Sequence, residues 1–328
     1  MLIDQIDSLP YNLIYQIEVD DCSRARREGH IMLEILSIVL PIFIVFACGF
    51  FLKKRFKTDI ASLSNVAFYC LLPALVFKTF YTSHISREIG WIILFAVALI
   101  IVLLLFTLLV SRCFRYDKGT EIGLLLGSLF GNGGNYGSSI ILLAYGQEGF
   151  DWAIAYFVIQ SMMTNSFGVF LAAQDSSGIW VTLKKTFKMP ILYAGLLGFL
   201  CKSLEIELHP IIYTPIELLS QAMIPLLMLI LGMQLAMIKN FGFMKGVTLG
   251  VCIRLLISPL LAYFILMLFP FNELAHKVLL LQAAMPTAVV VTLITLQYNR
   301  TPEMVAGIAM FSTLFSSVTV SVLLYLLQ

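Results

Sequence analysis

The sequence predicts an all-α membrane protein whose chain crosses the bilayer many times. Hydrophobic residues make up 60% of the 328 positions, charged residues only 12%, and the mean hydropathy is +0.94. The apolar runs repeatedly reach the roughly 20 residues that a helix needs to span about 30 Å of hydrocarbon. They are continuous, whereas the strands of a membrane β-barrel alternate between apolar and polar residues. The net charge of +2 is too small to indicate a nucleic-acid partner.

Ten spans are expected, joined by loops too short to hold a soluble domain. They cover residues 33–52, 60–81, 90–111, 121–146, 152–173, 190–204, 212–238, 243–269, 275–298 and 303–327. Glycine and proline inside these segments blur their boundaries but leave their number unchanged. Residues 1–32 form a polar N-terminal segment without the apolar core of a signal peptide, and Met32 is an alternative physiological start.

The orientation follows from the basic residues, which favour cytoplasmic loops. Loops after the odd-numbered spans carry Lys53, Lys54, Arg55, Lys57, Arg112, Arg115, Lys118, Lys184, Lys185, Lys188, Lys239, Lys245 and Arg300. The other loops hold little beyond Arg87, Lys202 and Lys277. We therefore expect the odd-numbered loops in the cytoplasm, both termini outside, and a multi-pass protein of the cell membrane.

An internal repeat is indicated by matching residues in the two halves. Pro41, Gly49 and Lys53 recur 149 positions later as Pro190, Gly198 and Lys202, and Pro73 corresponds to Pro225. Five spans per half is an odd number, so the halves would have opposite orientations in the membrane, as in transporters with inverted repeats. The expected division is a first repeat over 33–173, a cytoplasmic loop over 174–189 and a second repeat over 190–328.

Span 4 is broken at its middle by Gly131-Asn132-Gly133-Gly134-Asn135-Tyr136-Gly137-Ser138. Glycine is costly in a helix and asparagine competes for backbone hydrogen bonds, so two half-helices, Ile122–Phe130 and Ser138–Tyr145, are predicted. Unwound backbone at membrane depth survives only when it is buried in protein or lines a wet cavity. Such a break is typical of a transporter's binding site, although a kink that only aids packing is the alternative.

Span 9 contains a matching break at Ala283-Ala284-Met285-Pro286-Thr287-Ala288, because Pro286 lacks a backbone donor. If the breaks cross, unpaired N–H groups at Ser138, Ser139, Thr287 and Ala288 would converge and attract an anion. The freed carbonyls of Gly131 and Met285 would instead suit a cation.

Two further sets of polar residues lie inside spans. Gln160, Ser161, Thr164 and Asn165 of span 5 lie together on the helix surface, where they either bind substrate or join helices. Arg254 lies well inside span 8, and a buried cation is a candidate functional group by default. Its alternatives are to extend toward the cytoplasmic surface or to pair with a carbonyl.

Other kinds of site are not indicated by the sequence. The six cysteines and four histidines form no metal-ligand cluster, most of the cysteines lie in or beside apolar runs, and no Asp or Glu lies in mid-membrane. The sequence has no Walker A motif and no catalytic constellation, so we expect neither an ATP-driven pump nor an enzyme, and no cofactor.

The chain resembles the auxin efflux carrier family, which contains the plant PIN-FORMED carriers and bacterial malate or malonate permeases. The resemblance covers residues 33–327 and rests on motifs in six spans. These are Leu72-Pro73-Ala74-Leu75-Val76-Phe77, Asn132-Gly133-Gly134-Asn135-Tyr136-Gly137, Gln160 with Gly168, Pro225-Leu226 with Gly232, Arg254 with Pro259, and Ala284-Met285-Pro286-Thr287-Ala288.

The resemblance implies ten helices in two inverted five-helix repeats, an elevator motion, a substrate site where broken helices 4 and 9 cross, and often a homodimer. One departure is that Gly137-Ser138-Ser139 stands where the family has a Gly-x-Pro pattern.

The leading hypothesis is a secondary active or facilitative carrier of a small organic anion, either a dicarboxylate such as malate or malonate or an auxin-like monocarboxylate. Candidate substrate-binding residues are Asn132, Asn135, Tyr136, Ser138, Ser139, Gln160, Asn165, Arg254, Met285, Pro286 and Thr287. Expected partners are the anion, the lipid bilayer, a coupling ion (H⁺ or Na⁺) and a second copy of the chain. The alternatives are a sodium-coupled symporter for bile-acid-like anions and a receptor that does not transport.

Overall fold

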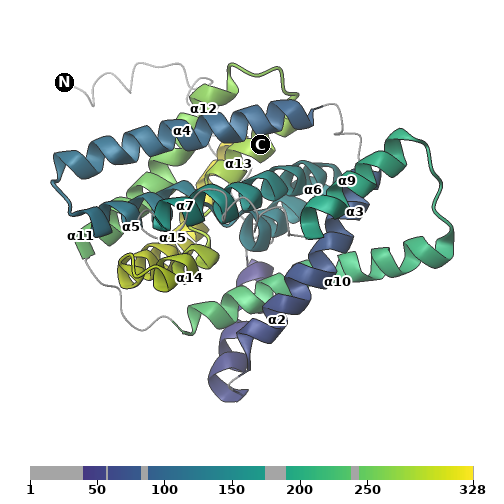
Figure 1. Ribbon diagram of the computed structural model, residues 1–328, viewed down its shortest axis with the longest axis horizontal. Coiled ribbons are helices and arrows are strands. Elements are labelled where there is room, and N and C mark those ends of the chain that lie inside the picture. Colours follow the sequence, from purple (N-terminus) through teal and green to yellow (C-terminus); the bar gives the residue numbers. More distant parts are fainter. Residues whose placement is uncertain (1–39, 57, 83–87, 174–189, 238–243, 328) are drawn as a thin grey trace, which may run out of the picture.

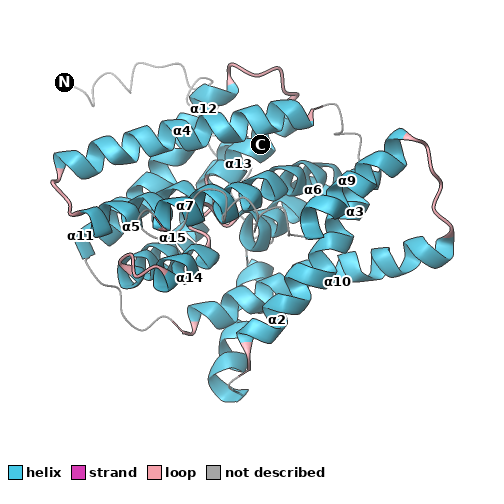
Figure 2. Ribbon diagram, in the orientation of Figure 1, coloured by secondary structure: helices cyan, strands magenta, loops and turns pink. Residues whose placement is uncertain are grey.

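The described part of the computed structural model is entirely helical apart from short connections (Figure 2). It comprises residues 40–56, 58–82, 88–173, 190–237 and 244–327. Within these ranges no strand is formed, and the all-α prediction is confirmed. Six helical segments are long and apolar enough to cross a membrane, namely Ile60–Thr82, Ile89–Cys113, Ser138–Ala172, Pro210–Leu235, Met244–Leu266 and Pro302–Leu327.

The first half of the chain begins, in the described part, with a helix over residues 40–56. Helices α2 (Ile60–Val66) and α3 (Leu72–Thr82) follow, joined by a π-helical turn, and then come α4 (Ile89–Cys113) and α5 (Lys118–Leu129). After the predicted break come a π-helical turn (Gly133–Gly137), α6 (Ser138–Met163), a second such turn (Thr164–Gly168) and α7 (Val169–Ala172). Within α6, Gly146 leaves the helical conformation at φ 65°, which separates spans 4 and 5.

The second half contains α9 (Pro190–Ser203), α10 (Pro210–Leu235), α11 (Met244–Cys252) and α12 (Ser258–Leu266). A π-helical turn (Ile253–Ile257) joins α11 to α12. Helices α13 (Glu273–Ala283) and α14 (Val289–Gln297) are the two parts of broken span 9, and α15 (Pro302–Leu327) ends the fold. Both predicted breaks are therefore present. The predicted segments 1–32 and 174–189 lie wholly outside the described residues.

The helix starts follow local chemistry. The side chains of Asp59, Asp117 and Asn272 accept hydrogen bonds from backbone N–H groups in the first turns of α2, α5 and α13. Such caps satisfy donors that have no partner within the helix. Proline opens α9, α10 and α15, where its missing N–H has no cost.

Buried apolar side chains form two clusters. The smaller one joins the segment Ala67–Val76 to α9 and α10 and includes Phe150, Ile154 and Val158 of α6. The larger one joins α4, α5, α7 and α11–α15 with the other face of α6 and with Ile42 and Phe46. In Figure 1, α2, α3, α9 and α10 accordingly lie to one side and α4, α5, α11, α14 and α15 to the other, with α6 between them.

Candidate functional site at the crossing of the broken helices

The two breaks meet and pair with each other. Gly131 and Thr287 form an isolated antiparallel bridge. The Asn132 N–H donates to the Pro286 carbonyl at 2.6 Å, and the Ala288 N–H donates to the Phe130 carbonyl at 3.0 Å. The unwound segments thus satisfy part of each other's backbone, which is required of irregular structure at membrane depth.

The residues at the crossing suit this close approach. Phe130 and Ala288 are extended, at φ −110° and −66° with ψ 112° and 126°. Gly131 has no room for a side chain, because a Cβ there would lie 2.2 Å from Nη2 of Arg254. Pro286 interrupts span 9 without leaving a donor unpaired. Glycine and proline therefore specify the crossing directly.

The second half-helix of span 4 starts earlier than predicted. The Gly137 N–H donates to the Asn132 carbonyl at 3.0 Å and the Ser138 N–H donates to the Gly133 carbonyl, so helical winding begins at Gly133. The expectation of an unpaired N–H at Ser138 is therefore wrong. The i to i+5 pattern of a π-helical turn accommodates the glycines without disrupting the winding.

The same correction applies on the other side of the crossing. The Thr287 N–H donates to Ser312 Oγ at 3.1 Å, and the Ala288 N–H is held by Phe130. The Met285 carbonyl, expected to be free, accepts from Arg254 Nε at 2.7 Å. The backbone groups available at this break are thus the N–H groups of the first turn of α14, at Val289 and Val290.

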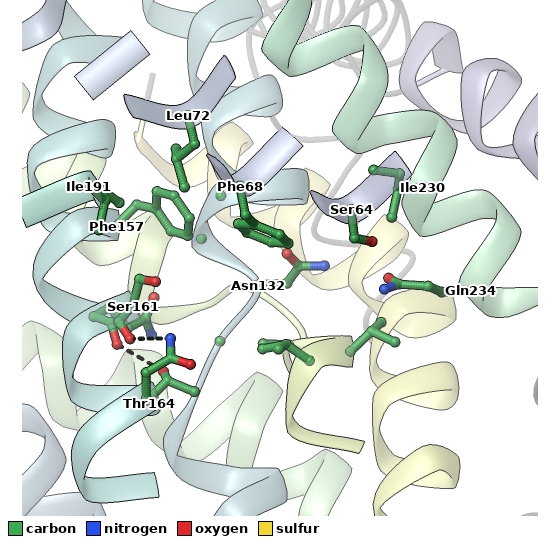
Figure 3. Close-up of a pocket in the computed structure, with 18 of the residues that line it drawn as sticks. Ser64, Phe68, Leu72, Asn132, Phe157, Ser161, Thr164, Ile191, Ile230 and Gln234 are labelled. Atoms are coloured by element: carbon green, nitrogen blue, oxygen red, sulfur yellow. Dashed lines mark hydrogen bonds between the residues drawn. The ribbon is translucent and has the colours of Figure 1, made fainter. Parts of the chain in front are cut away.

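A cavity of about 320 Å³ lies beside the crossing (Figure 3). It is bounded by the two breaks, the α2–α3 segment, α6, and α9 with α10. The lining residues are Ser64, Asn65, Phe68, Tyr69, Leu72, Gly131, Asn132, Gly133, Gly134, Phe157, Gln160, Ser161, Thr164, Asn165, Pro190, Ile191, Ile230, Gln234, Ala288, Val289 and Val290. Its size and mixture of aromatic, aliphatic and amide groups are typical of a small-molecule site.

The electrostatics of the cavity come from the backbone and from amides. None of the described residues that line it carries a charge. Both second half-helices present their first residues to it, through Gly133 and Gly134 and through Val289 and Val290. Helix N-termini carry partial positive charge and free N–H donors. The buried side-chain atoms Asn132 Nδ2 and Gln160 Oε1 have no hydrogen-bond partner within the described structure. Gln234 Oε1, which also lines the cavity, likewise has no described partner. A ligand would therefore meet donors, amide acceptors and a positive potential.

The chain also matches a family of known proteins. The family model described as "Membrane transport protein" matches residues 34–181 and 177–324. The chain belongs to this family. The resemblance to the auxin efflux carriers is thereby confirmed, and the protein is a multi-pass membrane transporter.

Two archaeal relatives extend the match over most of the chain. An "Uncharacterized transporter" of Methanothermobacter thermautotrophicus is 28% identical over 290 residues, which covers 86% of this chain and 94% of the relative. "Uncharacterized transporter MJ1031" of Methanocaldococcus jannaschii is 26% identical over 299 residues, covering 87% and 96%.

Three of the predicted site residues line the transporter's cavity, namely Asn132, Gln160 and Asn165. Asn165 also donates to the Ser161 carbonyl at 2.8 Å, which leaves its amide oxygen to face a ligand. Asn135 lies in the π-helical turn of the first break, and its side chain is outside the described residues.

The other predicted residues are buried around the crossing and are not part of the cavity lining. Tyr136 packs on Phe43 and Phe46, and its hydroxyl is 2.9 Å from Ser316 Oγ. Thr287 Oγ1 donates to the Gly127 carbonyl at 2.6 Å, and Ser138 Oγ donates to the Gly134 carbonyl. Ser139, Met285 and Pro286 are likewise enclosed, and Arg254 is directed at carbonyls.

Several residues that matter here were not predicted from the sequence. Ser64, Asn65 and Gln234 line the cavity from α2 and α10. Gln282, fully buried on α13, donates to the carbonyls of Gly133 at 3.3 Å and Ala153 at 3.2 Å. Each is a polar side chain inside or beside an apolar span, which is the signal that could have identified it.

Proposed function

We propose that the protein is a secondary carrier for a small organic anion, whose carboxylate binds in the cavity at the crossing. The observation that carries the proposal is the convergence of two helix N-termini and the unpartnered Asn132 amide on one uncharged cavity. Carboxylates accept hydrogen bonds from such donors and are stabilised by the helix dipole. Apolar lining such as Phe68, Leu72 and Ile191 would hold the rest of the substrate.

The charge balance favours a substrate with one carboxylate at this point. Each helix N-terminus is equivalent to roughly half a positive charge, so two supply roughly one. A second carboxylate would find no cationic side chain among the residues that line the cavity. A monocarboxylate is therefore the better fit, and a dicarboxylate such as malate would place its second group toward Ser64 and Gln234.

The ten-helix inverted repeat is part of the proposal and is supported by reciprocal contacts. A Cβ on Gly49 would lie 2.2 Å from the Leu229 carbonyl oxygen, and a Cβ on Gly198 would lie 2.5 Å from the Phe77 carbonyl oxygen. Gly198 is the repeat partner of Gly49, and Phe77 stands to Leu229 as Pro73 does to Pro225. Exchanging the halves thus maps one helix contact onto the other, as two related repeats would.

An elevator-type motion is proposed on the same grounds. The cluster formed by the α2–α3 segment, α9 and α10 would be the fixed scaffold, and the larger cluster, which holds both breaks, would move. Such a carrier exposes one site alternately to each side of the membrane. The proposed topology in the cell membrane places both termini outside. A homodimer is proposed from the family resemblance alone.

A sodium-coupled mode is the second candidate, favoured by a specific pair of atoms. A Cβ on Gly133 would lie 2.5 Å from Gln282 Oε1 and 2.9 Å from Gln160 Oε1, so both amide oxygens converge on one small space. Both lack a described partner. Amide oxygens are suitable ligands for a hard cation.

The test is uptake by purified protein in proteoliposomes. Radiolabelled malate and a monocarboxylate such as indole-3-acetate would be supplied with and without pH, sodium and voltage gradients. Saturable uptake that competing carboxylates inhibit is expected, and the gradient that accelerates it identifies the coupling ion. No uptake of any carboxylate, with no thermal stabilisation by them, would contradict the proposal.

A further inference from the structure

Arg254 is a buried cation whose observed partners are all main-chain carbonyls. Its side chain is 1% exposed and projects from the π-helical turn between α11 and α12. Nε donates to Met285 at 2.7 Å, Nη2 to Ala283 at 3.1 Å, and Nη1 to Ser128 at 3.2 Å and Leu129 at 3.4 Å. Four of the five guanidinium donors are thus accounted for.

These carbonyls belong to the ends of two helices. Ser128 and Leu129 end α5, and Ala283 ends α13, with Met285 just beyond. The last carbonyls of a helix have no partner within it, and they carry partial negative charge. Two C-termini supply roughly one negative charge between them, which matches the single positive charge of the guanidinium. A buried arginine is thereby stabilised without a carboxylate.

The contacts also connect the two breaks through one rigid group. The planar guanidinium holds α5 and α13 together on one side of the crossing, while the cavity lies at the N-termini of the following half-helices. Ser258, one turn after Arg254, adds a hydrogen bond to the Ala283 carbonyl at 2.7 Å. Gly131 packs directly on Nη2, so the crossing and the guanidinium are in contact.

We propose that Arg254 is a positioning residue, which clamps the C-terminal ends of α5 and α13 and thereby sets the geometry of the anion site without touching the anion. The clamp neutralises the negative ends of the first half-helices, so the positive ends of the second half-helices determine the potential in the cavity. The proposed carrier function is needed only for the transport readout of this inference.

The first experiment replaces Arg254 with Lys or Gln and follows hydrogen–deuterium exchange in detergent by mass spectrometry. Lysine keeps the charge but lacks the planar fork, so it cannot bind both helix ends as arginine does. We expect faster exchange confined to the peptides around residues 128–134 and 283–290, which contain the bridging amides of Asn132 and Ala288. The α4 peptides (Ile89–Cys113) should be unchanged. Arg112→Lys is the control, since Arg112 is exposed at the end of α4.

The second readout is the kinetics of uptake. Misplacing a binding group by about 1 Å can cost on the order of 100-fold, so the KM of Arg254→Lys for the transported carboxylate should rise between tenfold and 100-fold. The amount of folded protein should change little. Increased exchange over the whole protein with an unchanged KM would show that Arg254 only supports packing, and would overturn the proposal.

A second variant disturbs the Arg254 guanidinium without changing Arg254 itself. Gly131→Ala would place a methyl group 2.2 Å from Nη2 and displace the guanidinium without removing its charge. The same local pattern of exchange is expected, so the clamp can be tested even if neither Arg254 variant folds. Exchange that is unchanged around 283–290 would overturn it. If the unmodified protein shows no uptake, the carrier proposal fails, while the exchange result still decides the role of Arg254.

Discussion

At the scale of single residues, the cavity is lined by amide side chains, of which Asn132 lies in the break of span 4 and Gln160 and Asn165 lie in span 5. Asn132 is buried, and its Nδ2 has no partner in the described structure. A buried donor without a partner costs about 1–3 kcal/mol, and a ligand that accepts from it would remove this cost. Tyr136, four residues on, is as deeply buried but bonds to Ser316 instead of facing the cavity.

Asn132→Ala should weaken binding of the carboxylate strongly. A hydrogen bond to a charged group contributes about 1.5–3 kcal/mol, which corresponds to roughly 10- to 100-fold in affinity. The measurement is the KM for uptake and the half-saturating concentration for thermal stabilisation by the substrate. Tyr136→Phe is the matched control, since it removes a buried polar group outside the cavity and should leave the KM within about twofold. Equal KM values in the two variants would contradict the site.

At the scale of elements, the half-helices need defined starts because they are too short to be stable alone. Helix α5 is capped by Asp117, whose carboxylate accepts from the Thr120 N–H at 3.1 Å and from the Thr120 hydroxyl at 2.6 Å. These hydrogen bonds hold the pKa of the Asp117 carboxyl below its usual value. The ionised cap also interacts favourably with the helix dipole, which the neutral acid cannot do equally well.

Asp117→Ala should lower the stability of the folded protein by about 1 kcal/mol at neutral pH. Because the folded-state pKa is depressed, the stabilisation by the ionised cap is present above the unfolded pKa and is lost as the pH falls through the lower folded value. Thermal unfolding in detergent should show that the difference in stability between Asp117→Ala and the unmodified protein becomes smaller below about pH 4. Asp117→Asn keeps a capping oxygen, so it should lose less stability at neutral pH than Asp117→Ala does. A stability difference between Asp117→Ala and the unmodified protein that stays constant as the pH is lowered would contradict the role of the ionised cap.

At the scale of the whole molecule, α6 lies at a boundary between the two apolar clusters, so a relative motion of the clusters would change how α6 packs. A second cavity of about 180 Å³ lies at this boundary, lined by Thr79 of α3 and Phe150 of α6 among others. Within the proposed scaffold, α3 and α9 are in direct contact. A Cβ on Gly195 of α9 would lie 3.4 Å from Val76 Cγ1 of α3.

Cross-linking can distinguish motion at this boundary from a rigid molecule. In a background without the six native cysteines, Thr79→Cys with Phe150→Cys would be joined by a short bifunctional thiol reagent. Uptake should stop and should return after reduction, because the link fixes α6 to the scaffold. The control is Val76→Cys with Gly195→Cys, whose disulfide lies within the scaffold and should leave uptake intact. Full uptake with the first pair linked would contradict the elevator mechanism.

Much of the architecture was predictable from local chemistry. The helical class follows from the length of the apolar runs, and both breaks follow from glycine, asparagine and proline, whose backbone preferences act wherever they lie in the fold. The starting residue of the second half-helix was not predictable, because the π-helical turn at Gly133–Gly137 depends on how the glycines pack against Gln282 and Phe157. Gln160 and Asn165 were identified because a polar face in an apolar span is visible in the pattern.

The sequence by itself determined that this is a helical membrane protein with two interrupted spans, since composition and backbone preference do not depend on long-range contacts. Only the tertiary structure decided which polar groups face the cavity and which form hydrogen bonds within the protein. Thr287, Ser138 and Arg254 are as polar as Asn132 in the sequence, yet their hydrogen bonds are taken by carbonyls of their own or neighbouring segments. Whether a buried donor is left for a ligand depends on every acceptor around it, and some of those acceptors, such as the Gly127 and Ser128 carbonyls, come from segments more than a hundred residues away.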